Sequence, residues 1–401
     1  MPRLHWFNGA AEAEVARGRP GFHPRRETAS LLADLEATPL FYAAPGDAVL
    51  VDTLPGTAWL GSLAAAGFAL PAFVTSAADV PGLEPAPWGR SPDAARRLGA
   101  PWSPADRDLY AKTSWVAVLA ELAATDDTAL VDPGDVGRVA RDEAALADAV
   151  AVARRGGADV VCVKAPWGTS GRGATRVLGG APTAAQAGWT RRILAEQGAL
   201  LVEPWRRRVA DLSVQVAVDD GGAEVLAVTR FFTDDRGQYI GTRLGAPLAD
   251  LPPADADRVA RALDRAARLV GARLHAAGHR GHAGLDALLW RDDGGALRLK
   301  PLLEVNPRVT MGLVALSLAR HLAPGVTGDW RLLGRRHLDA ARAPSLAALA
   351  AALGAAHPLA TDATGALVGG ALFTNDPARA QVCLGVALIG DAAGTADLGL
   401  A

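Results

Sequence analysis

The sequence predicts a mixed fold, in which an α/β domain is followed by a larger α+β region. The chain of 401 residues is longer than one ordinary domain, and half of its residues are apolar, so it can build more than one hydrophobic core. Up to about residue 105, short apolar runs alternate with segments of helical length. Beyond about residue 212, several apolar runs follow one another without a helix between them, which indicates antiparallel strands.

In the N-terminal part, the alternation predicts a small domain with a parallel sheet. Three short apolar runs are interpreted as strands, and two longer segments as helices. The strands are expected at residues 39–44, 48–52 and 70–76, and the helices at 27–37 and 55–67. The proline-rich stretch at 81–92 is expected to close the central part of this domain.

The middle of the chain contains clear helix boundaries. Ser103 is followed by a proline, which predicts the start of a helix that runs to about residue 124. A second helix is predicted with acidic residues at its start and Arg at its end, as the helix dipole favours. The elements from there on are this helix at 142–155, a strand at 160–164, a glycine loop, a return strand at 173–178, a helix at 183–197 and a strand at 199–205.

The rest of the chain predicts antiparallel strands and several helices. Three strands come first, and a long Arg- and Ala-rich helix separates them from a hairpin. The expected strands lie at 212–218, 223–233 and 238–245, the helix at 254–278, and the hairpin strands at 283–290 and 297–306. A helix at 311–322, an Ala-rich helix near 345–360 and a strand pair at 365–374 and 381–390 complete the prediction.

Charge and composition favour small-molecule partners. The net charge of -2 and the pI near 6.5 give no electrostatic reason to expect binding to nucleic acid or to an anionic membrane. The two cysteines, Cys162 and Cys383, cannot form a disulfide framework. The first residues have no apolar segment typical of a secretory signal, and the Ala-rich stretches are interrupted, so we expect a cytoplasmic protein without membrane spans.

Lysine is rare in this chain, and its positions indicate function. Of 41 basic residues, only Lys112, Lys164 and Lys300 are lysines. Lys164 ends an apolar strand and precedes a loop whose glycines allow the backbone to approach an anion. The loop residues expected to contact this anion are Gly168, Thr169, Ser170, Gly171 and Gly173. For the loop alone an ordinary hairpin is the simpler interpretation. The order of Lys and glycines excludes a Walker loop, and no G-x-G-x-x-G motif is present.

A second set of residues predicts a site for a hard divalent cation. In the stretch LEVNPR, Glu304 and Asn306 point to the same face of an extended strand. Asp286, on the preceding hairpin strand, is expected opposite residues 301–303 and within diagonal reach of Glu304. Mg²⁺ prefers a few such oxygen ligands together with substrate phosphates. A surface hairpin with solvated acids is the alternative, but both strands are otherwise apolar on both faces, which favours a buried site.

Together these motifs resemble the ATP-grasp superfamily. They are K-x-P-W-G-x-S-G-R-G, a strand ending in V-E-P-W, an Asp on a late hairpin, and E-V-N-P-R, in the expected order over about residues 105–400. The resemblance implies two α+β subdomains that bind ATP between them. An N-terminal pre-ATP-grasp α/β domain precedes them. It divides the chain into this N-terminal domain at 1–105, a small subdomain with the glycine loop at 106–204, and a C-terminal subdomain with the magnesium hairpin at 205–401.

The resemblance also implies how the nucleotide is bound. Lys112 and Lys164 are similar in position to the two phosphate-binding lysines of the superfamily. Glu203 resembles the hinge acid that accepts from the adenine amino group, and Asp211 the group that takes the ribose hydroxyls. Trp205 is expected either to pack on the adenine or to be an ordinary core residue.

Metal binding and catalysis follow from the same resemblance. Asp286, Glu304 and Asn306 match the Mg²⁺ ligands. Arg308 matches the Arg that contacts the γ-phosphate or the developing tetrahedral intermediate, so Arg308 and Lys164 are the expected catalytic residues. The sequence departs from many amino-acid ligases of the superfamily at Gly284, where they carry an Arg.

Three further features are left open by the sequence. Lys300 shares strand parity with Glu304, but Pro301 could break it. Arg230 could reach a phosphate. A zinc site is the rival interpretation of HAAGHRGH, but no Cys or carboxylate completes the set, so a polar helix end is favoured for His275, His279 and His282.

The implied activity is that of an ATP- and Mg²⁺-dependent ligase that forms C–N bonds. It would activate a small-molecule or peptide carboxylate as an acyl phosphate and join it to an amine or similar nucleophile. Two alternatives stay open: an ATP-grasp small-molecule kinase that transfers phosphate to a hydroxyl, and a non-catalytic ATP-binding module.

Overall fold

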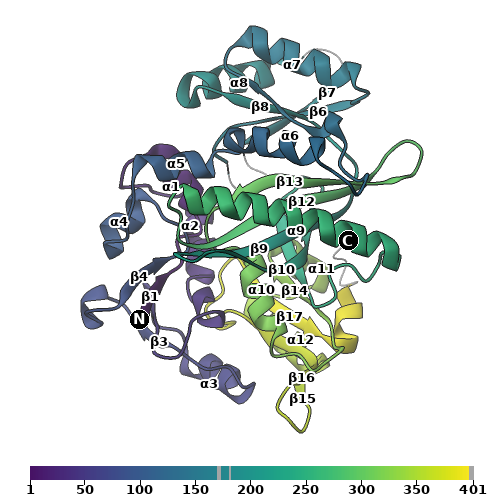
Figure 1. The fold of residues 1–401 in the computed structure, drawn as a ribbon. Coiled ribbons are helices and arrows are strands. Elements are labelled where there is room, and N and C mark those ends of the chain that lie inside the picture. The colour runs from purple at the N-terminus through teal and green to yellow at the C-terminus, as the bar shows by residue number, and fades with distance from the viewer. Residues whose placement is uncertain (169–172, 180–181, 397–401) are drawn as a thin grey trace.

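The computed structural model describes residues 1–168, 173–179 and 182–396 of the chain. Within these residues the chain forms three β-sheets, which we call the N-terminal sheet, the small sheet and the large sheet. Figure 1 shows the small sheet and its helices at one end of the molecule, with the large sheet next to it and the N-terminal elements along one side. The predicted combination of α/β and α+β structure is confirmed.

The N-terminal sheet has the strand order β3-β2-β1-β4, and its strand pairs are parallel, as predicted. Its strands are β1 (Arg3–Trp6), β2 (Ala48–Leu50), β3 (Ala72–Val74) and β4 (Glu84–Pro87). The helices of this part are α1 (Ala11–Arg17), α2 (Arg26–Asp34), α3 (Thr57–Ala65) and α4 (Pro92–Leu98), with the 3-10 turns η1 (Thr38–Phe41) and η2 (Ala77–Asp79).

Two predictions in this region are wrong. The run at 39–44 forms no strand, because Pro39 lies in the first turn of η1, where its fixed φ and missing N–H are favourable. The stretch at 81–92 contains β4, which its prolines concealed. The backbone nitrogens of the two prolines in β4 face away from β1, on the open side of this edge strand. The absence of their N–H groups therefore costs no hydrogen bond between β4 and β1.

The helix predicted from Ser103 to about residue 124 is broken into three pieces. Ser103 caps α5 (Pro104–Tyr110) through a capping box with Asp106. The 3-10 turn η3 (Lys112–Trp115) and then α6 (Val116–Ala124) follow. Because of the break, the N–H of Lys112 donates to the carbonyl of Pro166 at 3.0 Å. The break therefore connects Lys112 to the start of the glycine loop.

The small sheet follows the prediction closely. Its antiparallel order is β5-β8-β6-β7, formed by β5 (Arg138–Ala140), β6 (Val160–Lys164), β7 (Ala174–Leu178) and β8 (Leu200–Pro204). The side chains of Asp142 and Thr183 cap the helices α7 (Glu143–Arg155) and α8 (Ala184–Gln197). The turn η4 (Pro133–Asp135) precedes β5. One apolar cluster, drawn from residues 140–202, forms the core of this unit.

The large sheet is antiparallel, with the order β13-β12-β9-β10-β11-β14-β17-β16-β15. Its first half contains the predicted strands, β9 (Arg208–Asp219), β10 (Gly222–Thr233), β11 (Tyr239–Leu244), β12 (Gly281–Arg291) and β13 (Leu297–Asn306). Its second half contains β14 (Gly328–Leu333), β15 (Ala360–Thr361), β16 (Leu367–Phe373) and β17 (Leu384–Ile389). The sequence had predicted β16 and β17 but neither β14 nor β15.

Helices cover the large sheet. The predicted long helix α9 (Pro253–Ala276) packs on β9 and β10, and its buried side chains share a core with α6 and the hairpin β12–β13. The others are α10 (Met311–Ala319), α11 (Arg335–Ala341), α12 (Leu346–Ala356) and the turn η5 (Gly390–Ala396). No helix in the described part of the chain is both apolar enough and long enough to span a bilayer.

The N-terminal elements share a core with the C-terminal half of the chain. Phe7 and Trp59 pack in the same buried cluster as Leu313 and Trp330. Asp34 accepts hydrogen bonds from the backbone of residues 381–383, almost 350 positions later in the chain. The N-terminal sheet is therefore fixed against the large sheet, and the face between them has a defined geometry.

Candidate active site

Lys164 and Glu203 lie on neighbouring strands of the small sheet. Glu203 on β8 is directly opposite Cys162 on β6, and Lys164 lies two residues after Cys162 on the same face. The diagonal separation suits a long side chain, and the Lys164 Nζ lies 2.6 Å from Oε2 of Glu203. Both side chains are buried, so the sheet geometry produces an ion pair away from water.

A second lysine binds the same carboxylate. Nζ of Lys300, on β13, donates to Oε1 of Glu203 at 2.5 Å. Burial would raise the pKa of Glu203, but the two ammonium groups outweigh it and lower the pKa to about 2. Burial would lower the pKa of Lys164, but the charge of Glu203 raises it. The sequence left Lys300 open. In the structure Glu203 joins it to Lys164, which leaves neither oxygen of Glu203 without a lysine partner.

Lys112 connects the loop to the hairpin. Its Nζ donates to the carbonyl of Gly168 at 2.7 Å and to Oε1 of Glu304 at 2.6 Å. Glu304 is 192 residues away in the chain. Lys112, Lys164 and Lys300 all line one pocket of about 120 Å³, together with Gly168, Gly173, Glu203, Trp205 and Glu304. The scarce lysines of the sequence thus lie in one place.

The glycine loop is described only at its two ends. Gly173 has a φ of +79°, and a Cβ on it would lie 3.3 Å from the Cα of Gly168, so position 173 favours glycine. The expected anion contacts of Thr169, Ser170 and Gly171 lie outside the described residues. Their roles stay predictions.

Asp286 and Glu304 are direct cross-strand partners on β12 and β13. The expectation that Asp286 lies opposite residues 301–303 is wrong, because β13 has two extra residues between the pairs Asp286–Glu304 and Leu288–Lys300. This irregularity includes Pro301, which β13 tolerates as an edge strand. Asn306 lies on the same face, and its Nδ2 donates to Asp286 at 3.1 Å. The three predicted ligands therefore lie together.

The electrostatics of this group suit a divalent cation. Burial and the charge of Glu304 raise the pKa of Asp286 to about 7, against hydrogen bonds from Ser213 and Asn306. A cation between the two carboxylates would remove this penalty. Here the Oδ1 of Asn306 accepts from Arg308 at 3.1 Å, so the amide would present its oxygen to a cation only after it turns. Among the described residues no cluster of three His, Cys, Asp or Glu forms a metal site, so the amide would complete the set.

Arg308 binds a carboxylate that the sequence did not single out. Its guanidinium forms an ion pair with Glu12 on α1 and donates to the carbonyl of Val309 at 2.9 Å. Both side chains are buried. Glu12 lies 296 residues earlier in the chain, and the two Glu residues of the short segment AEAEVAR form no recognisable pattern. Only the fold brings it to Arg308.

Asp211 lies in a polar pocket of about 170 Å³ beside the acidic group. Its Oδ2 accepts from Thr233 at 2.7 Å and lies 3.3 Å from Nη1 of Arg208. Burial raises its pKa, against the charge of Arg208. Asp286, Glu304, Asn306 and Arg308 line the same pocket, so the predicted ribose-binding and metal-binding residues border one space.

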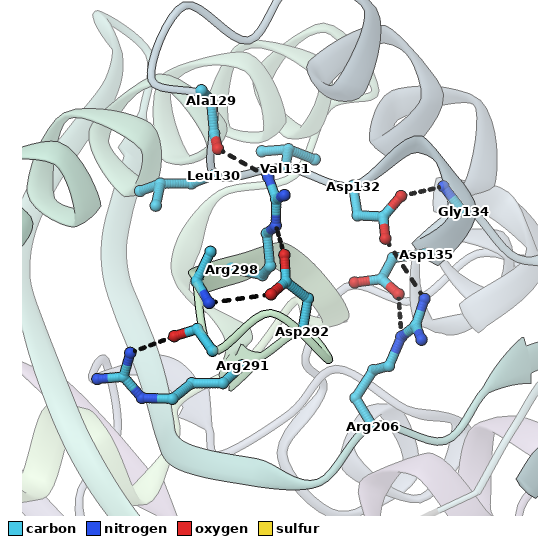
Figure 2. Close-up of polar contacts among 12 residues, drawn as sticks. Ala129, Leu130, Val131, Asp132, Gly134, Asp135, Arg206, Arg291, Asp292 and Arg298 are labelled. Atoms are coloured by element: carbon cyan, nitrogen blue, oxygen red, sulfur yellow. Dashed lines mark hydrogen bonds and ion pairs between the residues drawn. The ribbon is translucent and has the colours of Figure 1, made fainter. Parts of the chain in front are cut away.

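Trp205 is half-buried rather than a core residue. The guanidinium groups of Arg176 and Arg208 lie 4.9 and 5.2 Å from its ring centroids, and the ring borders the pocket that holds the lysines. The next residue, Arg206, donates to Asp135 at 2.8 Å and lies over Trp290 at 4.1 Å. Figure 2 shows the guanidinium of Arg206 bonded to both Asp132 and Asp135, which fixes the linker after β8 against the segment around η4.

The other candidates lie elsewhere. Arg230 forms an ion pair with Asp250 and does not border these pockets. His279 is buried and contacts the carbonyl of His282, and burial lowers the pKa of both to about 4. His275 contacts the carbonyl of Asp219. Gly284, the position at which many amino-acid ligases of the superfamily carry an Arg, is packed against Thr310. A Cβ at this position would lie 2.6 Å from Cγ2 of Thr310.

A larger cavity of about 740 Å³ adjoins the site. It lies between α1, α2 and the large sheet. Arg308, Tyr239 and Met311 line both this cavity and the polar pocket with Asp211, while Gly168 and Gly173 line both this cavity and the lysine pocket. The three spaces therefore share lining residues and adjoin one another.

Comparison with known proteins identifies the fold. No known family profile and no curated protein matches the sequence. A solved ADP complex of N5-carboxyaminoimidazole ribonucleotide synthetase aligns with 100% of this chain and 96% of its own at 12% identity, with a TM-score of 0.50. The ADP complex of the synthetase from Staphylococcus aureus aligns over the same shares at 10% identity, with a TM-score of 0.47. A Rhizobium etli pyruvate carboxylase aligns over 60% of this chain, which spans 22% of that enzyme, at 18% identity and a TM-score of 0.42.

The full-length alignment with the synthetase shows that this chain has the ATP-grasp fold. The resemblance expected from the sequence motifs is therefore confirmed at the level of the fold.

Proposed function

We propose that this chain, with its ATP-grasp fold, is an ATP- and Mg²⁺-dependent ligase that activates a carboxylate as an acyl phosphate and joins it to an amine or similar nucleophile. The observation that carries the proposal is the ion pair of Lys112 with Glu304. It brings a candidate phosphate-binding lysine into contact with a candidate metal ligand that lies 192 residues away in the chain. In the ADP-bound synthetase of the same fold, a nucleotide is present.

ATP would lie between the small sheet and the large sheet. Its phosphates would contact Lys112 and Lys164, which carboxylates already orient, and its adenine would lie near Glu203 and Trp205. Asp211 would take the ribose hydroxyls. The lysine pocket of about 120 Å³ is smaller than a typical ligand site, so we expect the small sheet to move away from the large sheet to admit ATP.

Asp286, Glu304 and Asn306 would hold Mg²⁺. Their shared strand face and the raised pKa of Asp286 fit a cation at this position. The ion would offset negative charge on the phosphoryl group that is transferred. The cationic side chains of Lys112, Lys164 and Arg308 would act on the same group from the protein side.

The reaction has two steps. A carboxylate oxygen of the substrate forms a bond to the γ-phosphorus, and the bond from this phosphorus to the bridging oxygen breaks with its electron pair on ADP. The nucleophile's nitrogen then bonds to the acyl carbon. The carbon–oxygen bond to phosphate breaks with its electron pair on phosphate, and the nitrogen loses a proton to solvent. Arg308 would stabilise the oxygen that becomes negative in this second step.

The test is the release of phosphate from ATP and Mg²⁺ with pools of carboxylates and amines. The proposal expects release only when a carboxylate and an amine are both present. Phosphate that stays on a hydroxyl acceptor would instead identify a kinase. Nucleotide binding without any turnover would identify a binding module.

Variants sharpen this test. We expect Lys164→Ala, Glu304→Gln and Arg308→Lys each to lower turnover by about 100-fold or more. The first removes a cation proposed to contact the phosphates, the second removes the charge of a proposed metal ligand, and the third removes the paired N–H donors of the guanidinium. Glu224→Gln, at an exposed position of β10, is the matched control and should keep full activity. Wild-type rates in Lys164→Ala or Glu304→Gln would overturn the proposal.

A further inference from the structure

The cavity of about 740 Å³ between α1, α2 and the large sheet is not needed for the nucleotide. Its volume lies within the range of small-molecule sites. It meets the polar pocket at Arg308, Tyr239 and Met311, the side of the site where the acyl phosphate would form. A molecule in this cavity would therefore reach the reacting carbon from the N-terminal side.

Most of the cavity wall is apolar. Side chains from α1, α2 and α10 meet there with residues that directly follow β1 and β4, and the apolar ones include Phe7, Phe22, Leu31, Leu32, Trp88 and Met311. Among the described lining residues, the basic side chains are Arg308, which is paired with Glu12, and Arg25, which is exposed. The wall favours a ligand with a large apolar group and offers little to a phosphorylated one.

Glu12 is the polar group at the inner end. The residue is 4% exposed, and its Oε1 accepts from Arg308. Its other oxygen, Oε2, is buried and has no hydrogen-bond partner within the described part of the chain. An unsatisfied buried carboxylate oxygen is costly, and a turn of the Glu12 carboxylate toward the cavity would let a ligand N–H satisfy it. Glu12 therefore offers an acceptor beside Arg308 in a mostly apolar space.

We propose that this cavity binds the nucleophile of the ligation, an amine that carries a large aromatic or branched apolar group, and that Glu12 accepts a hydrogen bond from its nitrogen. This inference rests on the proposed function, and it adds the substrate class. Glu12 contacts the substrate nitrogen and keeps its bond to Arg308. The apolar group fills the space between α1 and α2.

Binding can be measured without ATP and without knowledge of the carboxylate. The probes are phenethylamine, ethylamine and 3-phenylpropionate, titrated into the full chain by calorimetry. Phenethylamine should bind at least about tenfold more tightly than either of the others, because only it provides both the ring and the N–H donor. Tighter binding of 3-phenylpropionate, or no binding of phenethylamine at about 10 mM, overturns the proposal.

Two variants assign the contacts. Glu12→Gln should weaken phenethylamine binding by about tenfold or more. Glu27→Gln is the matched control at an exposed position on the same cavity, and should change it less than about threefold. Ala13→Phe fills the cavity from α1 and should remove the preference for phenethylamine over ethylamine. Equal binding by wild type, Glu12→Gln and Ala13→Phe contradicts the assignment.

Thermal unfolding confirms that each variant is folded. If phenethylamine is preferred but no substrate pool releases phosphate, the proposed ligase activity is wrong. The proposed ligand class of the cavity is then still supported. Phosphate release with small hydrophilic amines alone, and no preference for phenethylamine, would support the ligase and overturn this inference.

Discussion

Glu203 is the residue on which the buried charges of the small sheet depend. It lies 2.6 Å from Lys164 and 2.5 Å from Lys300, and the side chains of all three are at most 13% exposed. Without its carboxylate, the two ammonium groups would remain buried without this directly bonded counter-charge. A buried charge that loses its partner costs far more than an exposed one.

The first prediction follows for Glu203→Gln. We expect the free energy of unfolding to fall by about 3–5 kcal/mol, measured by urea denaturation. Glu196→Gln removes the partner of Arg192 in an exposed ion pair, and it should cost less than about 1 kcal/mol. Similar losses for the two variants would show that the buried charges are stabilised in another way.

Gly284 is a residue whose identity is set by packing. A Cβ at this position would lie 2.6 Å from Cγ2 of Thr310, whose hydroxyl donates to Gln215 at 2.6 Å. We predict that Gly284→Ala destabilises the protein by about 1–3 kcal/mol through overpacking. The double variant with Thr310→Ser keeps the hydroxyl and removes the methyl group, so it should recover most of the loss. No recovery, measured in the same urea titration, would contradict this explanation.

At the scale of elements, α1 contributes a second buried carboxylate besides Glu12. Glu14 accepts from Ser91 at 2.5 Å and from Asn8 at 3.1 Å, and Asp93 and Glu12 lie near it. Burial raises its pKa to about 7, against the hydrogen bonds from Ser91 and Asn8. The helix is therefore most stable in place when this carboxyl group is protonated.

The sign of the pH effect follows from this shift. Because the folded pKa lies above the unfolded value of 4.5, stability from Glu14 is complete below about pH 4.5 and is lost as the pH rises through about 7. We predict that wild type loses about 3 kcal/mol more than Glu14→Gln between pH 4.5 and pH 8. Denaturation at both pH values measures the difference. Parallel pH profiles for the two proteins would show that Glu14 does not titrate in this range.

Local signals predicted some elements well and others poorly. The helix α7 was predicted from the acidic residues at its start and the Arg residues at its end, and the side chains of Asp142 and Thr183 cap α7 and α8 in the structure. The strand β4 was missed because its prolines are acceptable only at a sheet edge, and edges are not visible in a sequence. The contact of Glu12 with Arg308 spans 296 residues, so no local pattern encodes it. The irregularity of β13 similarly changed the partner expected for Asp286.

At the scale of the whole molecule, packing suggests how the chain is divided. We propose that residues 138–204 move as one body, because their apolar cluster is their own. The segment from α5 to α6 packs with α9 and the large sheet, and the N-terminal elements share a core with α10 and β14. The division at residue 106 expected from the sequence is therefore replaced, in this proposal, by one near residue 138.

Hydrogen exchange tests this division. Amides of residues 138–204 should exchange faster than those of α9, whose buried face lies in the main core. A non-hydrolysable ATP analogue with Mg²⁺ should slow exchange in β6 and β8 and leave α12 unchanged. Uniform protection throughout the chain, or no effect of the analogue on β6, would argue against a mobile small sheet that closes on a nucleotide.

The scarcity of lysine has a practical consequence. All three lysines line one pocket, and their side chains are between 3% and 13% exposed. Apart from the α-amino group at Met1, an acylating reagent added to the folded protein would find amines only in that pocket. Covalent labelling, followed by peptide mass mapping, would therefore report directly on whether the pocket is open, shut or filled.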